Sequence, residues 1–339
     1  MLGWQQPPEL CEVPVPEPGP GEVLLRVGGA GVCHSDLHLM QWPEGVAPYP
    51  LPFTLGHENA GWVERVGAGV EGWQPGDAVA VCGHWGCGHC RECRRGRETL
   101  CERLGRSGVF GGGLGRDGGM AEFMLVPSAR LLVALDSLDP RDAAPLTDAA
   151  LTPYHAIKRA LPLLVPGSTA VLIGIGGLGH LGVQLLRALS PATVIAVDLS
   201  AEKLRLAREL GAHETVESGP AAARAIRQLT GGLGAELVAD FVGVDATMAL
   251  AAAAVRRGGE VAIVGLGGGT LRYALGTLPF DATLTTPYWG TAAELGEVLA
   301  LARAGAIATH TERFPLERAA EAYARLRDGT LDGRAVICP

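Results

Sequence analysis

Four of the eight cysteines lie in one short segment, C-G-H-C-R-E-C-R-R-G-R-E-T-L-C. They are Cys87, Cys90, Cys93 and Cys101, spaced C-x2-C-x2-C-x7-C. A loop that carries several glycines can fold four thiolates at this spacing around one tetrahedral ion. A ferredoxin-type iron–sulfur run places its fourth cysteine after three residues and before a proline, whereas here the gap is seven and Glu102 follows. The spacing therefore predicts a structural zinc ion in a closed site with no open position for a substrate.

A glycine pattern, G-I-G-G-L-G, directly follows the apolar run A-V-L-I and opens an amphipathic stretch. Its residues are Gly174, Gly176, Gly177, Leu178 and Gly179. After a strand, such glycines permit a tight turn and the close approach of a pyrophosphate, which the N-terminus of the next helix attracts. Asp198 ends the next apolar run, where a carboxylate accepts ribose hydroxyls and repels a 2′-phosphate. The pattern predicts an NAD site; the alternative is an ordinary glycine-rich turn with a solvated Asp198. Lys203, shortly after, either contacts the adenosine ribose or is a surface lysine.

Two single residues are further candidates for metal ligands. Cys33 stands in G-V-C-H-S-D-L-H and His57 in L-G-H-E-N-A-G, each beside a glycine turn. A lone cysteine or histidine is more often a buried packing residue than a ligand. The residues alone leave both interpretations open.

The elements that must position these groups differ between the two halves of the chain. The 339 residues are enough for two domains. Residues 10–145 show short apolar runs separated by glycine and proline turns, which predicts an all-β half. From about residue 168, apolar runs alternate with helical patterns, which predicts βαβ units and an open parallel sheet. Helices are expected near 245–256, 292–304 and 316–327, with a last short strand at R-A-V-I-C.

Composition narrows the class of partner. The net charge is −8 and no long basic run occurs, so neither nucleic acid nor an anionic membrane is an expected partner, and small molecules are. Every long apolar stretch is interrupted before the roughly 20 residues that a membrane helix needs. The first residues show no secretory signal pattern. The remaining cysteines are scattered, which fits a reducing compartment, and we expect a cytoplasmic protein.

Taken together, these motifs occur in the order and spacing of the zinc-containing medium-chain alcohol dehydrogenases. The sequence resembles that family over nearly its whole length, including G-H-E-x-x-G-x5-G-x2-V from Gly56 to Val70. The resemblance implies that Cys33 and His57 bind a catalytic zinc ion, with Glu58 beside it as a neighbour or transient ligand. NAD and two zinc ions per chain are the cofactors it implies.

A third ligand to the catalytic zinc is needed, and many relatives use a cysteine. This chain has no cysteine between Cys101 and Cys338. Asp148, in L-T-D-A-A-L-T-P-Y-H-A, fills the matching position, and its alternative role is a helix N-cap. Asp142 and His155 are less favoured alternatives as ligands.

The resemblance also implies roles around the zinc. Ser35 hydrogen-bonds the substrate oxygen, and His38 either passes the proton to solvent or is a bystander. Asp36 orients His57 through its ring N–H. A further expected contact is that of Arg334 with the cofactor's pyrophosphate, with a surface arginine as the alternative. Tyr49 and Trp289 are expected along a pocket for hydrophobic substrates, with ordinary core aromatics as the alternative.

The expected fold class is α/β, with a GroES-like β-rich catalytic domain (residues 1–149 and 286–339) and a Rossmann doubly wound domain (residues 150–285). The cleft between them would be the active site. The expected activity is reversible hydride transfer between primary or secondary alcohols and NAD, by a homotetramer or dimer. A catalytically silent NAD-binding relative and a zinc-free quinone or enoyl reductase are the alternatives. Relatives usually open with a short strand where M-L-G-W-Q-Q-P-P stands here, so the first sheet is expected to lack an edge.

Overall fold

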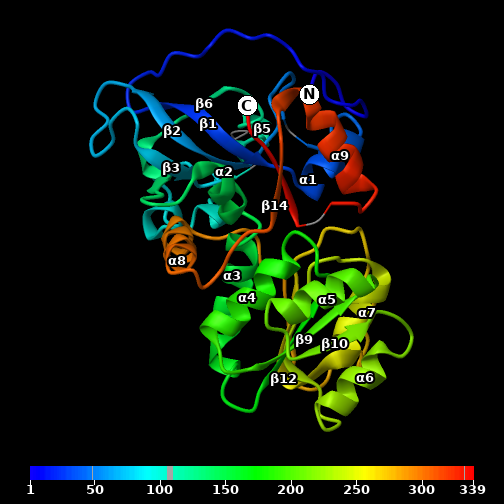
Figure 1. Ribbon diagram of the computed structural model, residues 1–339. Coiled ribbons are helices and arrows are strands. Elements are labelled where there is room, and N and C mark those ends of the chain that lie inside the picture. Colours follow the sequence, from blue (N-terminus) through cyan, green and yellow to red (C-terminus); the bar gives the residue numbers. More distant parts are fainter. Residues whose placement is uncertain (48, 105–109, 332) are drawn as a thin grey trace. The chain divides into compact units, whose positions relative to one another are not determined.

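The computed structural model describes residues 1–47, 49–104, 110–331 and 333–339. The chain divides into two units, which are coloured in chain order in Figure 1. The first unit contains Met1–Leu151, Gly290–Gly305 and Thr309–Pro339, and the second contains Thr152–Trp289 and Ala306–Ala308. The units thus divide after Leu151 and Trp289, where the sequence analysis placed boundaries after residues 149 and 285.

The first unit is built on a mixed sheet in the order β14-β15-β1-β2-β3-β7, with β6 also paired to β1. Its strands are β1 (Val23–Gly31), β2 (Glu58–Val66), β3 (Ala78–Val81), β6 (Phe123–Val126), β7 (Leu132–Ala134), β14 (Thr311–Phe314) and β15 (Arg334–Ile337). A two-stranded piece pairs β4 (Gly111–Gly112) with β5 (Gly115–Arg116). Every residue of β1 except Arg26 is buried, and β1 pairs with three other strands. The last strands of the chain therefore complete a sheet that the first strand begins.

Helices of the first unit include two that the sequence analysis missed, α1 (His34–Gln41) and α2 (Pro140–Ala143). They also include α8 (Ala292–Arg303) and α9 (Ala319–Arg327). The expectation of an all-β half over 10–145 was wrong at the short helix α2 and at α1, which begins directly after Cys33 and lies beside α9 (Figure 1). Residues 1–22 form no strand, and the sheet ends at β14 and β7.

The second unit is a doubly wound parallel sheet, as expected. Its strand order is β10-β9-β8-β11-β12-β13, and each neighbouring pair is parallel. The strands are β8 (Thr169–Ile173), β9 (Thr193–Asp198), β10 (Glu214–Glu217), β11 (Ala235–Asp240), β12 (Val255–Ile263) and β13 (Thr283–Thr285). The helices are α3 (Leu151–Ala160), which begins at the boundary, α4 (Gly179–Leu189), α5 (Ala201–Glu209), α6 (Ala222–Leu229) and α7 (Asp245–Ala254). The order reverses between β8 and β11, the switch point at which such sheets bind ligands.

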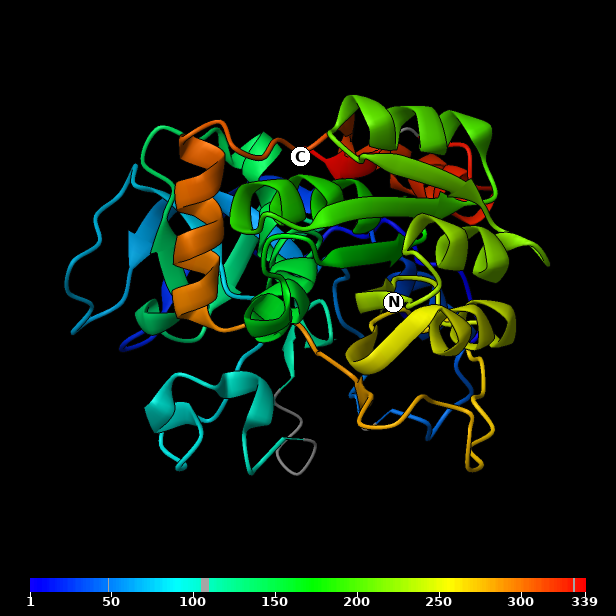
Figure 2. The ribbon, with the colours of Figure 1, turned by 90° about the horizontal axis from the view of Figure 1, so that it is seen from below.

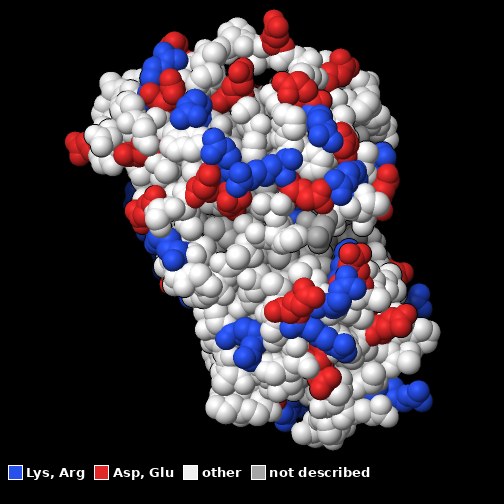
Figure 3. Space-filling view, viewed as in Figure 1, with Lys and Arg blue, Asp and Glu red and all other residues white. Residues whose placement is uncertain are grey.

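Charged side chains of both signs alternate on the face shown in Figure 3, with no large area of a single sign. This distribution agrees with a moderate net charge of −8 spread over the chain. Among the described residues, we find no helix whose length and apolar content would let it cross a lipid bilayer.

The turn after β8 requires glycine at one position for a steric reason. A Cβ atom on Gly179 would lie 1.9 Å from the carbonyl oxygen of Gly174, whereas a Cβ on Gly176 would meet no atom within 4 Å. The start of α4 therefore packs against the turn so closely that only hydrogen fits at Gly179.

Gly179→Ala should destabilise the second unit, since the clash involves backbone and cannot be relieved by a rotamer change. We expect a loss of about 1–3 kcal/mol in the free energy of unfolding, as for other overpacked sites. The matched control Gly176→Ala should be neutral or stabilising by up to about 1 kcal/mol. Urea unfolding followed by circular dichroism measures both, and equal stability of the two variants would contradict this account.

Candidate functional site

Cys33 and His57 meet because the strands that carry them pair in antiparallel fashion. Gly31, the last residue of β1, lies opposite Glu58, the first residue of β2. Cys33 follows β1 and His57 precedes β2, so both side chains come from the same end of the pair. The backbone N–H of Val32 also bonds the carbonyl oxygen of Ala335 in β15. Three strands thus bring their ends together at this point.

Asp148 joins this pair at distances suited to a shared ion. It ends the 3-10 helix Ala144–Thr147, which packs on β1 and β2. Asp148 Oδ2 lies 3.9 Å from the Sγ of Cys33 and 3.6 Å from the Nε2 of His57. Metal bonds of about 2.0–2.3 Å place the donors of a tetrahedral ion about 3.3–3.8 Å apart. The thiol, imidazole and carboxylate therefore fit a zinc ion.

The two alternative third ligands lie elsewhere. Asp142 forms an ion pair with Arg313 at 2.6 Å, and half of its side chain is exposed. His155 lies on α3 in the second unit. In the described part of the chain, the group that shares one potential metal position contains Cys33, His57, Glu58 and Asp148, with donor atoms within 4.8 Å of one another.

A fully buried carboxylate, Asp36, sits behind this group. Its Oδ1 lies 3.0 Å from the Nδ1 of His57, and its Oδ2 accepts the backbone N–H of Cys33 at 3.2 Å. This is the contact through which Asp36 was expected to orient the ring. Burial by itself disfavours a charged imidazole, but Asp36 and Cys33 outweigh it and raise the pKa of His57 well above its usual value. The surroundings of His57 thus attract positive charge.

Glu58 is held by a buried arginine. Arg334, the first residue of β15, donates from Nε to the Oε2 of Glu58 at 3.0 Å and from Nη2 to Oε1. Gly31 makes room for this carboxylate, since a Cβ there would overlap it. Burial raises the pKa of Glu58 to about 7, although the Arg334 guanidinium opposes the shift. The sequence analysis expected Arg334 on a pyrophosphate; here its guanidinium engages Glu58, and the pyrophosphate contact stays a prediction.

The remaining expected site residues lie in both units. Ser35 places its Oγ 3.6 Å from the Sγ of Cys33. His38 is half-buried on α1, and burial lowers its pKa, which favours the neutral ring. Tyr49 packs edge-on against Phe53 and Phe110 in the first unit, with ring centroids 6.1 and 4.8 Å away. Trp289 is buried at the end of the second unit's main segment.

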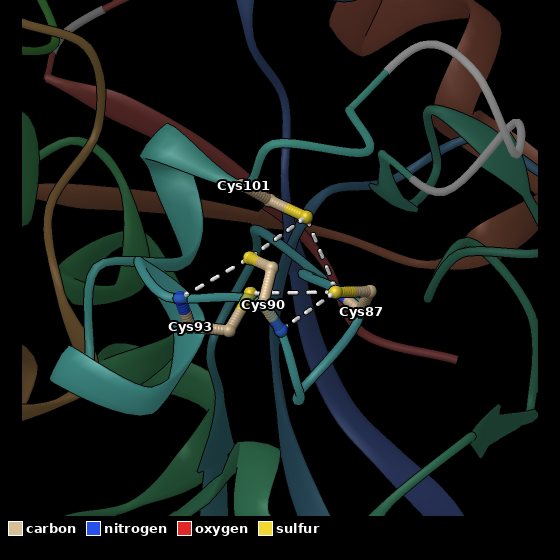
Figure 4. A group of neighbouring side chains, drawn as sticks. All are labelled: Cys87, Cys90, Cys93 and Cys101. Carbon is tan, nitrogen blue, oxygen red and sulfur yellow. Dashed lines mark hydrogen bonds between the residues drawn. The ribbon is translucent and has the colours of Figure 1, made fainter.

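The four clustered cysteines converge on one point, as Figure 4 shows. The Sγ atoms of Cys87 and Cys93 lie 4.0 Å apart, and those of Cys90 and Cys101 lie 3.9 Å apart. Zinc–sulfur bonds of about 2.3 Å would set the sulfur atoms of a tetrahedral site about 3.8 Å apart. Hydrogen bonds from backbone N–H groups, first that of Cys93, lower the pKa of Cys90 to about 6. The site fits a four-thiolate zinc ion.

The lobe that carries these cysteines extends away from the sheet of the first unit, in cyan in Figure 2. Arg130 ties it to the sheet, donating from Nη2 to the carbonyl oxygen of Gly86 at 2.5 Å and from Nη1 to Glu98 at 3.0 Å. A metal in the closed site would hold the lobe together from within.

The glycine turn of the second unit lies beside Asp198. The backbone N–H of Ile175 donates to Asp198 Oδ2 at 2.7 Å, and that of Ser200 donates to Oδ1 at 2.9 Å. The carboxylate is thereby fixed at the carboxyl end of β9, next to the turn. In the described residues no side chain caps the N-terminus of α4, whose dipole favours a phosphate. Lys203 lies half-buried on α5, and its role stays a prediction.

Sequence reasoning missed one buried polar residue at the site. The hydroxyl of Tyr323, on α9, donates to Asp36 Oδ2 at 2.9 Å. Tyr323 lies in an ordinary helical pattern, and its separation of 287 positions from Asp36 leaves no local signal of the contact.

Comparison with protein families gives two matches along the chain. Residues 19–137 match the alcohol dehydrogenase GroES-like domain, and residues 177–304 match the zinc-binding dehydrogenase domain.

Individual relatives match over almost the full length. The chain is 36% identical over 348 residues to an NAD-dependent alcohol dehydrogenase of Sulfurisphaera tokodaii, covering 98% of this chain and 97% of the relative. It is also 36% identical over 340 residues to a D-arabinose 1-dehydrogenase (NADP(+)) of Saccharolobus solfataricus, covering 99% and 95%.

Solved structures show the same relationship. The alcohol dehydrogenase of Aeropyrum pernix superimposes with a TM-score of 0.92 at 37% identity, covering 100% of this chain and 98% of that one. A cobalt- and zinc-bound alcohol dehydrogenase of Pyrobaculum aerophilum gives a TM-score of 0.85 at 30% identity, covering 99% and 98%.

Arg334→Met should strongly destabilise the first unit, because it leaves the Glu58 carboxylate buried without its cation. Breaking a buried pair in this way costs about 3–5 kcal/mol. The exposed pair Arg65–Glu17 supplies a control, and Arg65→Met should cost no more than about 1 kcal/mol. Chemical denaturation measures both, and adding Glu58→Gln to Arg334→Met should recover part of the loss. A small effect of Arg334→Met alone would mean that Glu58 does not depend on this partner.

Proposed function

Because the chain belongs to the zinc-type medium-chain alcohol dehydrogenase family, we propose that it transfers hydride reversibly between primary or secondary alcohols and NAD. The observation that carries this proposal is the convergence of Cys33, His57 and Asp148, whose donors are spaced for one tetrahedral zinc ion. Three protein ligands leave a fourth position for a substrate oxygen, as catalytic zinc sites require. The four cysteines of the lobe would hold a second, structural zinc ion.

Zinc at the three-ligand site would supply a Lewis acid that lowers the pKa of an alcohol hydroxyl, and NAD would accept the hydride. The protein's own residues do the rest. Asp36 fixes the ring of His57 through Nδ1, so that Nε2 is directed toward Asp148 and would hold the metal. Ser35, beside Cys33, would accept a hydrogen bond from the substrate hydroxyl and release its own proton as it takes up that of the substrate. The neutral ring of His38 would then accept the released proton before it reaches solvent.

The preference for NAD rests on Asp198. Its carboxylate is fixed by two backbone N–H groups at the end of β9, where the adenosine ribose of a bound dinucleotide is expected. A negative charge there accepts ribose hydroxyls and repels the 2′-phosphate of NADP. The relative named as NADP-dependent and the NAD-dependent relative are equally similar to this chain, at 36% identity. Overall identity therefore does not indicate the cofactor, and the proposal depends on Asp198.

Hydrophobic alcohols are the proposed substrates. This part of the proposal rests on Tyr49, which packs against Phe53 and Phe110, and on the buried Trp289, both of which the family resemblance implies as substrate contacts. A zinc-free quinone or enoyl reductase would need neither the Cys33, His57 and Asp148 set nor the four-cysteine lobe. A homotetramer or dimer in the cytoplasm completes the proposal and rests on the family resemblance.

Metal analysis and alcohol oxidation test the proposal directly. The wild-type protein should contain about two zinc ions per chain and reduce NAD with alcohols. Asp148→Ala should lose one zinc ion and lower kcat/KM by more than about 100-fold, since even groups that merely support metal ligands can cost this much. Asp142→Ala is the matched control and should keep both zinc ions and the activity. One zinc ion in the active wild type, or full activity of Asp148→Ala, would refute the two-site assignment.

Substitution of Asp198 tests the cofactor assignment. Asp198→Gly removes the charge that accepts ribose hydroxyls and repels a 2′-phosphate. The ratio of kcat/KM for NAD to that for NADP should fall by about 10- to 100-fold, as hydrogen bonds to a charged group are worth about 1.5–3 kcal/mol. Asp198→Asn, which keeps an acceptor for the Ile175 N–H, should shift the ratio in the same direction. An unchanged ratio would contradict the role of Asp198.

A further inference from the structure

The Asp36 carboxylate receives hydrogen bonds from three separate parts of the chain. Cys33 donates its backbone N–H at the start of α1, His57 presents Nδ1 before β2, and Tyr323 donates its hydroxyl from α9. Asp36 is 0% exposed, and Tyr323 is 5% exposed. Water therefore cannot replace a donor that is lost, and each bond matters more than it would at the surface.

Two of the three donors belong to residues that carry metal ligands. Asp36 Oδ1 faces the ring of His57, and Oδ2 is shared between Cys33 N–H and the hydroxyl of Tyr323. Rotation of the Asp36 carboxylate would thus disturb the imidazole and the turn that carries the thiol at once. The bond from Tyr323 opposes this rotation, because it ties Oδ2 to α9, a helix separate from the chain segment that carries Cys33.

We propose that Tyr323 is a positioning residue for the catalytic metal, acting through Asp36 on His57 and Cys33. This inference rests on the proposed function. The hydroxyl of Tyr323 is also 3.0 Å from the Sδ of Met120, a far weaker acceptor than the carboxylate, so the proton goes to Asp36. Burial, supported by the charge of Asp36, raises the pKa of Tyr323 well above its usual value, so the hydroxyl keeps its proton.

A purely structural role would give a different pattern. The side chain of Tyr323 is buried, and the ring of phenylalanine would fill the same space. If packing were the whole role, Tyr323→Phe would leave the metal untouched. If positioning is the role, the same variant leaves Asp36 Oδ2 with the Cys33 N–H as its one remaining donor in the described structure.

The test is metal release from the holoenzyme, measured with an excess of a chromophoric zinc chelator. In Tyr323→Phe, one of the two zinc ions should leave about tenfold faster than in the wild type, at the low end of the 10–100-fold effects of groups that support ligands. The other zinc ion, in the four-cysteine lobe, is the internal control and should leave at the wild-type rate. Met120→Leu, which keeps the bond to Asp36, should release both at wild-type rates.

A double-mutant cycle tests whether Tyr323 acts on the metal ligands through Asp36. Asp36→Asn alone should also speed release of the same zinc ion, and adding Tyr323→Phe to it should have a smaller effect than in the wild-type background. Wild-type release rates in Tyr323→Phe, or full additivity with Asp36→Asn, would overturn the inference. Failure of the proposed function is distinguishable, since it would already show in the wild type as a missing zinc ion or missing alcohol oxidation.

Discussion

Four acidic side chains are buried close together in the first unit, and each needs a compensating partner. Cys33, Asp36 and Glu58 are at most 5% exposed, and the side chain of Asp148 is 14% exposed. Solvent cannot screen charges in such a place, and unpaired ones are costly. Arg334 neutralises Glu58, and the ring of His57 lies between two of the other carboxylates. A divalent cation would balance much of the remaining negative charge, so metal binding and the stability of this unit would be coupled.

The two candidate metal sites are built in different ways. The four-cysteine site draws all of its donors from one loop, Cys87–Cys101, and uses every tetrahedral position. The other site draws a thiol, an imidazole and a carboxylate from three distant segments and offers three positions. A loop can close on an ion by itself, whereas a site with an open position must be held in shape by the surrounding fold. This is why the strands, α1 and α9 all meet at the second site.

The same difference explains what the sequence could predict. The cysteine lobe and the glycine turn carry their chemistry in short, contiguous patterns, and the parallel sheet follows from alternating apolar and helical runs. Cys33, His57 and Asp148 could be assigned only through resemblance to a family, because nothing local links them. Helix α1 was missed because its N-cap is Cys33, a residue type that rarely signals a helix start.

Side-chain contacts that arise from long-range packing could not be predicted from sequence patterns. Arg334 and Glu58 are 276 positions apart in the sequence, and no sequence motif around either residue predicts their contact. Its physical basis appears only when β15 pairs with β1 and carries the guanidinium to the end of the strand.

The return of β15 to β1 also sets an order of events during synthesis. A chain leaving the ribosome exposes Cys33, His57 and Asp148 well before Tyr323 and Arg334 exist, although these two hold the neighbours of the ligands in place. Domains fold from the N-terminus as they emerge, but this unit must wait for its final strand. A metal that binds at Cys33, His57 and Asp148 with Tyr323 and Arg334 already in place would therefore bind only after α9 and β15 have been made.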